Sequence, residues 1–483
     1  MPSPGPDGID IGPGLGPAAD AGRRPGLDRL LSRLRHIVGD AHVVTDPDAM
    51  AGFLIDWTGR HRGQADAVLR PRTTDEVSRA VVECAEVDAE ICAQGGNTGL
   101  VGGSVPPSDR AGSRPRIVIS TARMTDIDDV DVIGRCVGVQ AGATVEAIDA
   151  RAGAVGLAFG VDLASRHSAT AGGVVATNAG GIRMIRRGNT RAQVLGIEAV
   201  LADGRILRRW TSLVKDNVGY DLPGLLTGSE GTLAVITRVL FRLVVPPRAS
   251  IVAVAAIDRV ADAVELIGTA ASRGLTVEAA ELMTEAGIAL VAAHGHRRPT
   301  AASGPFYVLL EVSGPGDVES AAVELLQGAG GLIDAVLEPG PARALWGARE
   351  AHTETIARSS VTPVVKLDIS VPIRALAEVF DELGAVGDRN DSPCRPVLFG
   401  HVGDGNIHVN LLDVPPDRVD DLTDRVFGIV TAHGGSISAE HGIGRAKVAW
   451  THLGREAADL ATMRAIKGAL DPRGVLNPGV LFA

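Results

Sequence analysis

The chain contains few of the features that mark disulfide-rich, secreted or membrane-spanning proteins. Among its 483 residues are only four cysteines, and none of them forms a C-x-x-C pair. We interpret them as buried thiols in a reducing compartment. No apolar run approaches the roughly 18 residues that cross a bilayer. The N-terminal M-P-S-P-G-P-D-G also lacks the basic and apolar segments of a signal peptide, so we expect a cytoplasmic protein with no transmembrane segment.

The chain also lacks an excess of basic charge. Its net charge is −11 at pH 7, which argues against binding to nucleic acid or to an anionic membrane. The hydrophobic share of 45% and the charged share of 22% are those of an ordinary soluble globular protein. The length suggests two or three domains. Arginine carries nearly all of the basic charge, because the only lysines are Lys215, Lys366, Lys447 and Lys467.

Apolar periodicity and turn residues predict an α+β protein. Residues 1–25 are mostly Gly, Pro and Ala and are expected to form a flexible tail. Helices are predicted at 27–38 and from Thr74, which we interpret as an N-cap. Short strands are predicted at 67–71, 89–93, 117–120, 137–141 and 194–204.

From about residue 247 the pattern changes to a regular alternation of strands and helices. It predicts a repeated β-α-β unit, which is typical of a ferredoxin-like domain. A helix is predicted at 456–469, and the terminal N-P-G-V-L-F at 477–482 is expected to pack back on the first half of the chain. The strands of the repeated unit are predicted at 250–256, 275–282, 306–312 and 332–337, and its helices at 260–272 and 318–328.

A histidine-containing stretch, F-G-H-V-G-D-G-N-I-H-V-N at 399–410, is the most distinctive chemical feature of the sequence. It places His401 and His408 on either side of a glycine-rich turn. Beyond the turn, apolar residues alternate with His408 and Asn410, which predicts a strand with one apolar face and one functional face. A second element, S-A-E-H-G-I-G at 438–444, adds Glu440 and His441.

Two imidazoles and one carboxylate are a suitable ligand set for zinc, or for iron or manganese. We therefore predict that His401, His408 and Glu440 bind a divalent metal. The alternative is that each histidine is an ordinary hydrogen-bonded polar residue, since the H-x6-H spacing alone is weak. Asp404 is another possible ligand, but in a Gly-Asp-Gly turn an aspartate more often caps its own loop.

Three clusters of small residues point to a long ligand lying against backbone. The first, Q-G-G-N-T-G-L-V-G-G-S at 94–104, could form simple tight turns or present backbone N–H groups to a diphosphate. It does not match G-x-G-x-x-G, so a Rossmann interpretation fails. Two further clusters lie at 168–181 and 215–236. Three such clusters together suggest a dinucleotide.

At these residues the sequence resembles the FAD-binding domain of the vanillyl-alcohol-oxidase type, also called the PCMH-type flavin domain. The C-terminal half resembles the D-2-hydroxyacid dehydrogenase branch, which contains D-lactate dehydrogenases, glycolate oxidase flavin subunits and D-2-hydroxyglutarate dehydrogenases. The resemblance extends from about residue 45 to Phe482. Its motifs are R-P at 70–71, Q-G-G-N-T-G-L at 94–100, A-G-G at 171–173, A-T-N-A-G-G at 176–181, T-G-S-E-G-T-L at 227–233, G-H-V-G-D-G-N-I-H at 400–408 and S-A-E-H-G-I-G at 438–444.

The resemblance implies a PCMH-type FAD-binding domain of two subdomains at 26–246. It also implies a ferredoxin-like substrate cap with the metal site at 247–440, and a C-terminal helical segment at 441–483 that packs on the FAD domain. FAD is expected to be non-covalent, with His167 a solvated loop residue rather than a covalent link. The expected FAD-binding residues are Gln94, Gly95, Gly96, Asn97, Thr98, Gly99, Ser168, Thr170, Gly172, Gly173, Thr177, Asn178, Gly180, Glu230, Gly231 and Asn477.

The segment V-K-L-D-I-S-V-P at 365–372 looks most like D-2-hydroxyglutarate dehydrogenases, whose substrate is a dicarboxylate. In that branch an arginine, a threonine four residues later and a lysine bind substrate. Here these residues are Arg349, Thr353 and Lys366. Arginine and lysine side chains are suited to gripping carboxylates. The alternative for Lys366 is a surface salt bridge to Asp368.

The expected reaction is oxidation of a D-2-hydroxy acid to the 2-oxo acid, with hydride transfer to flavin N5 and metal assistance. His441 is the expected general base, and Asn410 is expected to donate to a substrate carboxylate or to order the metal ligands. D-2-hydroxyglutarate is favoured, and D-lactate or glycolate oxidation is the alternative. From other classes, the metal site could be hydrolytic, or the chain could bind FAD without turnover.

The electron acceptor is expected to be a separate molecule. The sequence has neither the cysteine spacing of an iron–sulfur cluster nor an NAD fingerprint. An electron-transfer flavoprotein or a quinone would serve as acceptor, and assembly as a homodimer is left open.

Overall fold

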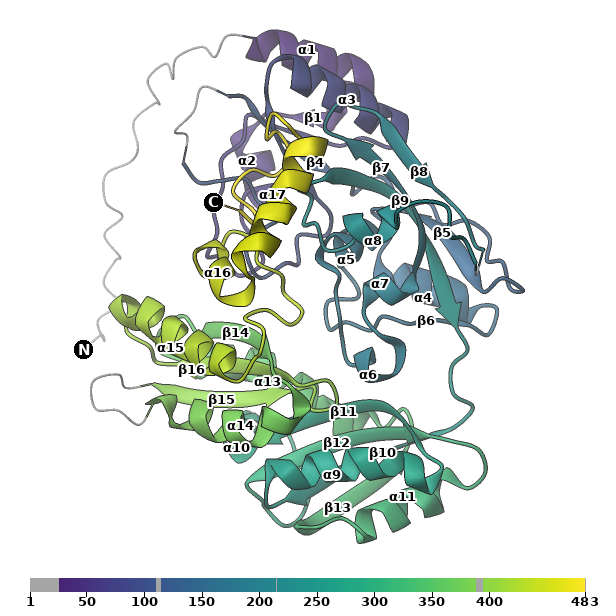
Figure 1. Ribbon diagram of the computed structural model, residues 1–483, viewed down its shortest axis with the longest axis vertical. Helices are drawn as coiled ribbons and strands as arrows, with labels where there is room; N and C mark the ends of the chain where they lie inside the picture. The colour runs from purple at the N-terminus through teal and green to yellow at the C-terminus, as the bar shows by residue number, and fades with distance from the viewer. Residues whose placement is uncertain (1–25, 110–113, 214, 388–393, 483) are drawn as a thin grey trace, which may run out of the picture.

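The computed structural model describes residues 26–109, 114–213, 215–387 and 394–482. The tail predicted at 1–25 lies outside the described residues. Figure 1 shows two small sheets in the half of the molecule that holds the N-terminal helices, and one large sheet in the other half. None of the helices in the described part of the chain is both long and apolar enough to cross a bilayer.

The first sheet has four strands in the order β1-β2-β4-β3, of which β2, β4 and β3 are parallel. Helices α1 (Leu27–Val38) and α3 (Thr74–Glu86) pack against it through buried apolar residues. The N-cap of α3 is Thr73 rather than Thr74: the Thr73 hydroxyl accepts from Glu76 N–H, and Thr74 donates to Glu198 instead. The strands are β1 (Val43–Val44), β2 (Ala67–Leu69), β4 (Arg116–Ser120) and β3 (Glu90–Gln94).

The second sheet has five strands. The long strand β9 (Ala234–Val244) lies between β5 (Cys136–Gln140) and β7 (Val194–Leu201), β8 (Ile206–Arg209) forms an edge, and β6 (Ala158–Phe159) also pairs with β9. All pairings in this sheet are antiparallel.

The second small-residue cluster is partly helical, which the sequence analysis did not predict. Helix α5 (Ala171–Thr177) begins after Thr170, whose hydroxyl accepts from Gly173 N–H, and ends at Asn178 in the left-handed region. Its residues Ala171 and Val174 pack into the core of the second sheet. The remaining short helices of this half are α2 (Pro47–Met50), α4 (Val145–Gly153), α6 (Met184–Arg187), α7 (Thr190–Gln193) and α8 (Leu222–Leu226).

The third sheet is entirely antiparallel and has seven strands in the order β13-β10-β12-β11-β15-β16-β14. Its first four strands have the order and helical crossovers of the predicted ferredoxin-like unit. The sheet does not end there, because β15 pairs with β11 and adds the histidine-bearing strands. The strands are β10 (Ser250–Ile257), β11 (Thr276–Thr284), β12 (Phe306–Ser313), β13 (Leu332–Pro339), β14 (Val365–Ser370), β15 (Arg395–Gly400) and β16 (Asn406–Leu412).

Both faces of this sheet are buried, as the alternation along β10 illustrates. Ile251, Ala253 and Ala255 belong to one apolar core, and Val252 and Val254 belong to the core on the opposite face. The first face is covered by α9 (Val260–Ala270), α11 (Val318–Gln327), α14 (Leu376–Gly384) and α15 (Val419–Ala432), and the second by α10 (Glu285–Ala293), α12 (Arg343–Glu350) and α13 (His352–Arg358).

The C-terminal segment returns to the first half of the molecule, as expected from the sequence. After α16 (Thr451–Gly454), helix α17 (Ala457–Leu470) lies beside the N-terminal sheets in Figure 1. Leu476 then pairs with Ile91 of β3, and Lys467 donates to the carbonyl groups of Thr232 and Leu476. These contacts close the chain on the sheet from which the glycine loop at 94–104 emerges.

Candidate functional site

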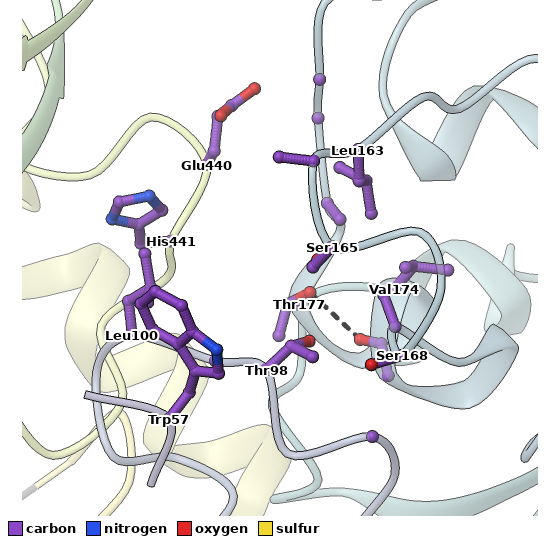
Figure 2. Close-up of a pocket in the computed structure, with 18 of the residues that line it drawn as sticks. Trp57, Thr98, Leu100, Leu163, Ser165, Ser168, Val174, Thr177, Glu440 and His441 are labelled. Carbon is purple, nitrogen blue, oxygen red and sulfur yellow. Dashed lines mark hydrogen bonds between the residues drawn. The ribbon is translucent and has the colours of Figure 1, made fainter. Parts of the chain in front are cut away.

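A cavity of about 710 Å³ is lined by residues from both halves of the molecule. Figure 2 shows Glu440 and His441 on one wall, opposite Ser165, Ser168 and Thr177. All predicted site residues line this cavity except Asn178 and Asn477. Tertiary folding therefore brings together residues that are up to about 350 positions apart in the sequence, here Gln94 and His441.

The first glycine loop is suited to holding a diphosphate. None of the backbone N–H groups of residues 95–99 donates a hydrogen bond to a described protein group, and all five residues line the cavity. Free N–H groups on a glycine-rich loop form a site for anions. The residues present thus fit the pyrophosphate of FAD.

Two glycines of this loop are required by its close approach to the segment before α5. A Cβ atom on Gly95 would lie 2.3 Å from Thr170 Oγ1, and one on Gly96 would lie 1.8 Å from the Ser168 carbonyl oxygen. The two predicted cofactor loops therefore touch each other. They form one continuous wall of the cavity.

We expect the Gly96→Ala variant to bind FAD about tenfold more weakly, because its methyl group must push the two loops apart at a cost of about 1–3 kcal/mol. The measurement is the dissociation constant of FAD from flavin fluorescence of the reconstituted apoprotein. Gly153→Ala is the control, since no atom lies within 4 Å of a Cβ at that helical glycine. Wild-type FAD affinity in Gly96→Ala would contradict this role for the loop contact.

Several predicted cofactor residues support the loops with their side chains. Gln94 Nε2 donates to the Phe53 and Ser104 carbonyls, and Asn97 Nδ2 donates to the Ile55 carbonyl. These side-chain hydrogen bonds thus fix the shape of the loop whose backbone N–H groups face the cavity.

Asn178 and Asn477, the two predicted residues outside the cavity wall, also brace the loops. Asn178 Oδ1 accepts from Arg191 N–H. Asn477 Nδ2 donates to the Gly103 and Glu230 carbonyls. These contacts fix the positions of loops around the cavity.

Glu230 joins the third small-residue cluster to the S-A-E-H-G-I-G segment. Its carboxylate accepts from Ile443 N–H at 2.9 Å and from Gly444 N–H at 2.7 Å. Burial raises the pKa of Glu230, and these two N–H groups act against that rise. The contact fixes Glu440 and His441, a few residues earlier, against the glycine loops.

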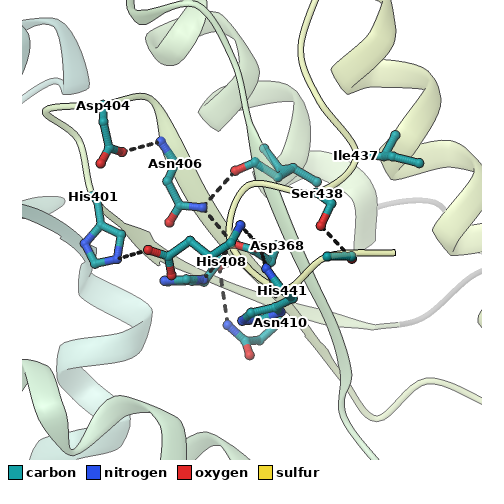
Figure 3. A network of polar contacts seen from close by, with 12 residues as sticks. Asp368, His401, Asp404, Asn406, His408, Asn410, Ile437, Ser438 and His441 are labelled. Carbon is teal, nitrogen blue, oxygen red and sulfur yellow. Dashed lines mark hydrogen bonds and ion pairs between the residues drawn. The ribbon is translucent and has the colours of Figure 1, made fainter. Parts of the chain in front are cut away.

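The three predicted metal ligands converge on one region of the cavity. His401 comes from the turn after β15, His408 from β16, and Glu440 from the loop after α15. One candidate ligand atom from each lies within 4.8 Å of the others, and His401 Nε2 is 3.6 Å from Glu440 Oε1. Figure 3 shows both histidines within a network of polar contacts that includes Asp368 and His441.

Two buried carboxylates lie behind the histidines, and the sequence analysis assigned neither of them to the site. His401 Nδ1 bonds Glu281, and His408 Nδ1 lies 3.4 Å from Asp368 Oδ1. A carboxylate on Nδ1 fixes the imidazole so that Nε2 faces a metal, the usual support for such ligands. The signal for Glu281 was present, because it is the one acidic residue in the apolar run A-A-E-L-M at 279–283.

Glu440 is the carboxylate best placed to ligate a cation. Its Oε1 is buried and has no hydrogen-bond partner, a costly state that a bound ion would relieve. Although burial opposes ionisation, His401 holds the pKa of Glu440 at about 2. The donor set thus fits a divalent metal.

Two other groups in the described chain have metal-like spacing. Asp368, His408 and His441 form one, but Asp368 already accepts from Asn406 Nδ2 and from the N–H groups of Glu440 and His441. The other combines His433 with two exposed glutamates, and it lies outside the cavity. The His401–His408–Glu440 group is therefore favoured.

Asp404 caps its own loop, which was the alternative to a role as a metal ligand. Its carboxylate accepts from Asn406 N–H at 3.2 Å, within its own turn. Burial raises the pKa of Asp404 to about 6.

The predicted FAD loops and the predicted metal site are in direct contact. A Cβ atom on Gly180 would lie 2.5 Å from Glu440 Oε1, so only glycine lets this carboxylate approach the backbone after α5. A group held by the loops and an ion held by Glu440 would therefore be close neighbours.

Arg349, Thr353 and Lys366 line the part of the cavity formed by the large sheet and its helices. Arg349 is buried, and its Nε donates to Glu281 Oε2 at 2.7 Å. The ammonium group of Lys366 makes no hydrogen bond or ion pair with the described residues, so the surface salt bridge to Asp368 is excluded as its role. Asp368 is fully buried and is engaged by the histidines and backbone instead.

Asn410 and His441 have more constrained positions than the sequence suggested. Asn410 lines the cavity, but its amide nitrogen donates to the Val397 and His408 carbonyls, so it supports the strands rather than offering its N–H groups to a ligand.

His441 Nδ1 faces Asp368 Oδ2 at 3.9 Å. Burial lowers the pKa of His441, which favours the neutral imidazole that a base requires.

Comparison with known proteins adds independent information. The FAD binding domain family matches residues 65–209, and the C-terminal domain of FAD linked oxidases matches residues 246–481. The D-2-hydroxyglutarate dehydrogenase of Xanthomonas citri pv. viticola is 37% identical over 470 residues, covering 94% of this chain and 97% of that protein. The mitochondrial D-2-hydroxyglutarate dehydrogenase of Bos taurus is 37% identical over 460 residues, covering 93% of this chain and 82% of that one.

Solved structures show the same fold at low identity. An alkyldihydroxyacetonephosphate synthase superposes with a TM-score of 0.72 at 16% sequence identity, covering 93% of this chain and 84% of that chain. At this identity the likeness concerns the fold alone. It agrees with the predicted PCMH-type architecture.

Proposed function

Since the chain belongs to the family of FAD-linked oxidases, we propose that it oxidises a D-2-hydroxy acid to the 2-oxo acid and prefers D-2-hydroxyglutarate. The observation that carries this proposal is the meeting of three groups in one cavity: the glycine loops, the His401–His408–Glu440 ligand set, and the cationic pair Arg349 and Lys366. A dicarboxylate is the substrate class that such a cationic pair favours. The relatives named D-2-hydroxyglutarate dehydrogenase support the same choice.

When bound, FAD supplies a hydride acceptor, and a divalent metal, with zinc our first choice and iron or manganese the alternatives, supplies positive charge beside the substrate hydroxyl. His401, His408 and Glu440 would hold the metal, and the loops at 94–99 and 168–180 would hold FAD. Lys366 binds one substrate carboxylate, and Arg349 and Thr353 bind substrate beside it. His441 removes the hydroxyl proton at Nε2, because its Nδ1 faces Asp368.

We further propose that FAD is bound without a covalent link. His167 lies at the cavity wall, but its side chain is 70% exposed and its Nδ1 is 2.7 Å from Glu146 Oε2, which is the solvated position of a loop residue. The absence of an NAD fingerprint supports a separate electron acceptor, either an electron-transfer flavoprotein or a quinone. Acid denaturation of the pure protein would release all flavin into the supernatant if the link is non-covalent.

Anaerobic mixing of the purified protein with D- and L-2-hydroxy acids tests the function. We expect D-2-hydroxyglutarate to bleach the flavin fastest, L-isomers to have no effect, and a chelator to abolish bleaching until zinc or manganese is restored. Faster bleaching by D-lactate or glycolate would favour the alternative substrates. A colourless protein would favour a hydrolytic metal centre, and bound flavin that no acid reduces would favour a chain without turnover.

A further inference from the structure

One buried carboxylate connects the predicted metal site with the predicted substrate site. The Glu281 side chain in the middle of β11 is fully buried. Its Oε1 bonds His401 Nδ1, and its Oε2 accepts from Arg349 Nε at 2.7 Å. Each carboxylate oxygen thus has one partner, and the two partners belong to different parts of the site.

Both contacts leave the nitrogen atoms that would bind a ligand, on His401 and on Arg349, facing the cavity. With Nδ1 held by Glu281, His401 directs Nε2 toward Glu440 at 3.6 Å. With Nε held, the two terminal nitrogens of Arg349 make no hydrogen bond to the described residues. Arg349 also stacks on Phe399 at 4.4 Å from its ring centroid. Because Phe399 lies two residues before His401, both partners are fixed to the same strand end.

We propose that Glu281 is a positioning residue that holds His401 and Arg349 in one fixed geometry, so that metal binding and carboxylate binding depend on the same side chain. The role of Arg349 in this inference rests on the proposed function. The role of His401 rests on the ligand geometry alone. Glu281 itself touches neither substrate nor cofactor, because it does not line the cavity.

Glutamine at this position has the right shape but the wrong chemistry. Both partners of Glu281 are donors, His401 through Nδ1–H and Arg349 through Nε–H, and a carboxylate accepts from both. A glutamine amide has one acceptor oxygen and one NH2 group that only donates, so one partner would face an N–H group. Loss of such a support typically weakens metal binding tenfold to a hundredfold.

The decisive experiment compares Glu281→Gln with the wild-type FAD-loaded protein. Zinc affinity is measured by competition with a chromophoric chelator. Glutarate, which cannot be oxidised, is titrated at saturating zinc and followed by the flavin spectrum. We expect both dissociation constants to rise about tenfold, and kcat/KM for D-2-hydroxyglutarate to fall mainly through KM. An effect on only one of the two affinities would overturn the proposal.

Glu278→Gln is the matched control. Glu278 is another buried glutamate of β11, but it pairs with Ser313 and Arg187 outside the cavity. The Glu278→Gln variant should leave the zinc and glutarate affinities unchanged even if it lowers stability. Equal effects of the two variants would therefore assign Glu281 a purely structural role and overturn the proposal. If Glu281→Gln does not fold, Glu281→Asp keeps the charge but is too short to reach both partners. Wild-type affinities in Glu281→Asp would overturn the proposal.

The outcomes separate this inference from the proposed function. A wild-type protein whose flavin no hydroxy acid reduces would overturn the function. The zinc and glutarate titrations need no turnover, and they would still decide whether Glu281 supports both partners.

Discussion

Replacing Glu440 with glutamine is expected to lower kcat/KM for D-2-hydroxyglutarate about a thousandfold while FAD stays bound. Its Oε1 is buried without a hydrogen-bond partner, so within the described chain the carboxylate is available for a cation. Removing its charge would deplete the site of metal. A metal ion beside the substrate oxygen contributes several kcal/mol to the transition state, and about 4 kcal/mol corresponds to about a thousandfold in rate. The measurements are the rate of anaerobic flavin reduction and the zinc content per protein.

Asp404→Asn is the matched control for this variant. Asp404 is a nearby, partly buried carboxylate that accepts a hydrogen bond from Asn406 N–H within its own turn. The asparagine oxygen can accept the same bond, so the amide variant should keep its zinc and stay within about threefold of the wild-type rate, which corresponds to about 0.6 kcal/mol. Full zinc content and an unchanged rate in Glu440→Gln would exclude the ligand role. Loss of zinc in Asp404→Asn would move that role to Asp404.

Replacing Lys366 with methionine is expected to separate dicarboxylate from monocarboxylate substrates. Lys366 lines the cavity and has no ion pair among the described residues, so its ammonium group is free for a substrate carboxylate. Burial, and after it the charge of Arg60, lowers the pKa of Lys366 because both disfavour the charged ammonium group. A bound carboxylate would offset this by stabilising the charged form. Removing one member of such a pair costs about 3 kcal/mol. We therefore expect kcat/KM for D-2-hydroxyglutarate to fall about a hundredfold.

The same variant should oxidise D-lactate at nearly the wild-type rate, because D-lactate has no second carboxylate. Steady-state kinetics on both acids measure the effect. Lys215→Met, at an exposed loop position in the other half of the molecule, is the control and should change neither rate. An equal fall for both acids would show that Lys366 does not discriminate by the second carboxylate.

Much of the fold follows from local patterns in the sequence. The apolar run at 250–256 and the helical spacing at 260–272 predicted β10 and α9 with nearly correct bounds. A strand buried on both faces has a short continuous apolar run, and a helix that buries one face has apolar residues at the helical period. The small-residue clusters predicted loops that meet a ligand. Helix α5 was missed because A-G-G-V-V-A-T has poor helix propensity, and it forms because Ala171 and Val174 pack into the core of the second sheet.

The candidate site was predicted less completely than the fold. His401, His408, Glu440 and Lys366 were identified because their residue types are unusual in their surroundings. Glu281 was missed although it is the one acidic residue in an apolar run, because the sequence around it does not show which partners it will meet. Its contact with His401 spans 120 positions in the sequence. The engagement of Asn410 by neighbouring strands was likewise visible only once β15 and β16 were paired.

The sequence by itself determined the family, most of the regular strands and helices, and the residue types that carry the chemistry, because these depend on patterns that extend over a few residues. Only the tertiary structure decided which of those residues meet. The approach of Gly180 to Glu440 depends on packing the two halves of the chain around one cavity. The bridge from Glu281 to both His401 and Arg349 depends on the pairing of β11 with β15 and on the packing of α12 against the large sheet. Such contacts are set by the burial of distant apolar faces, and no short segment contains that information.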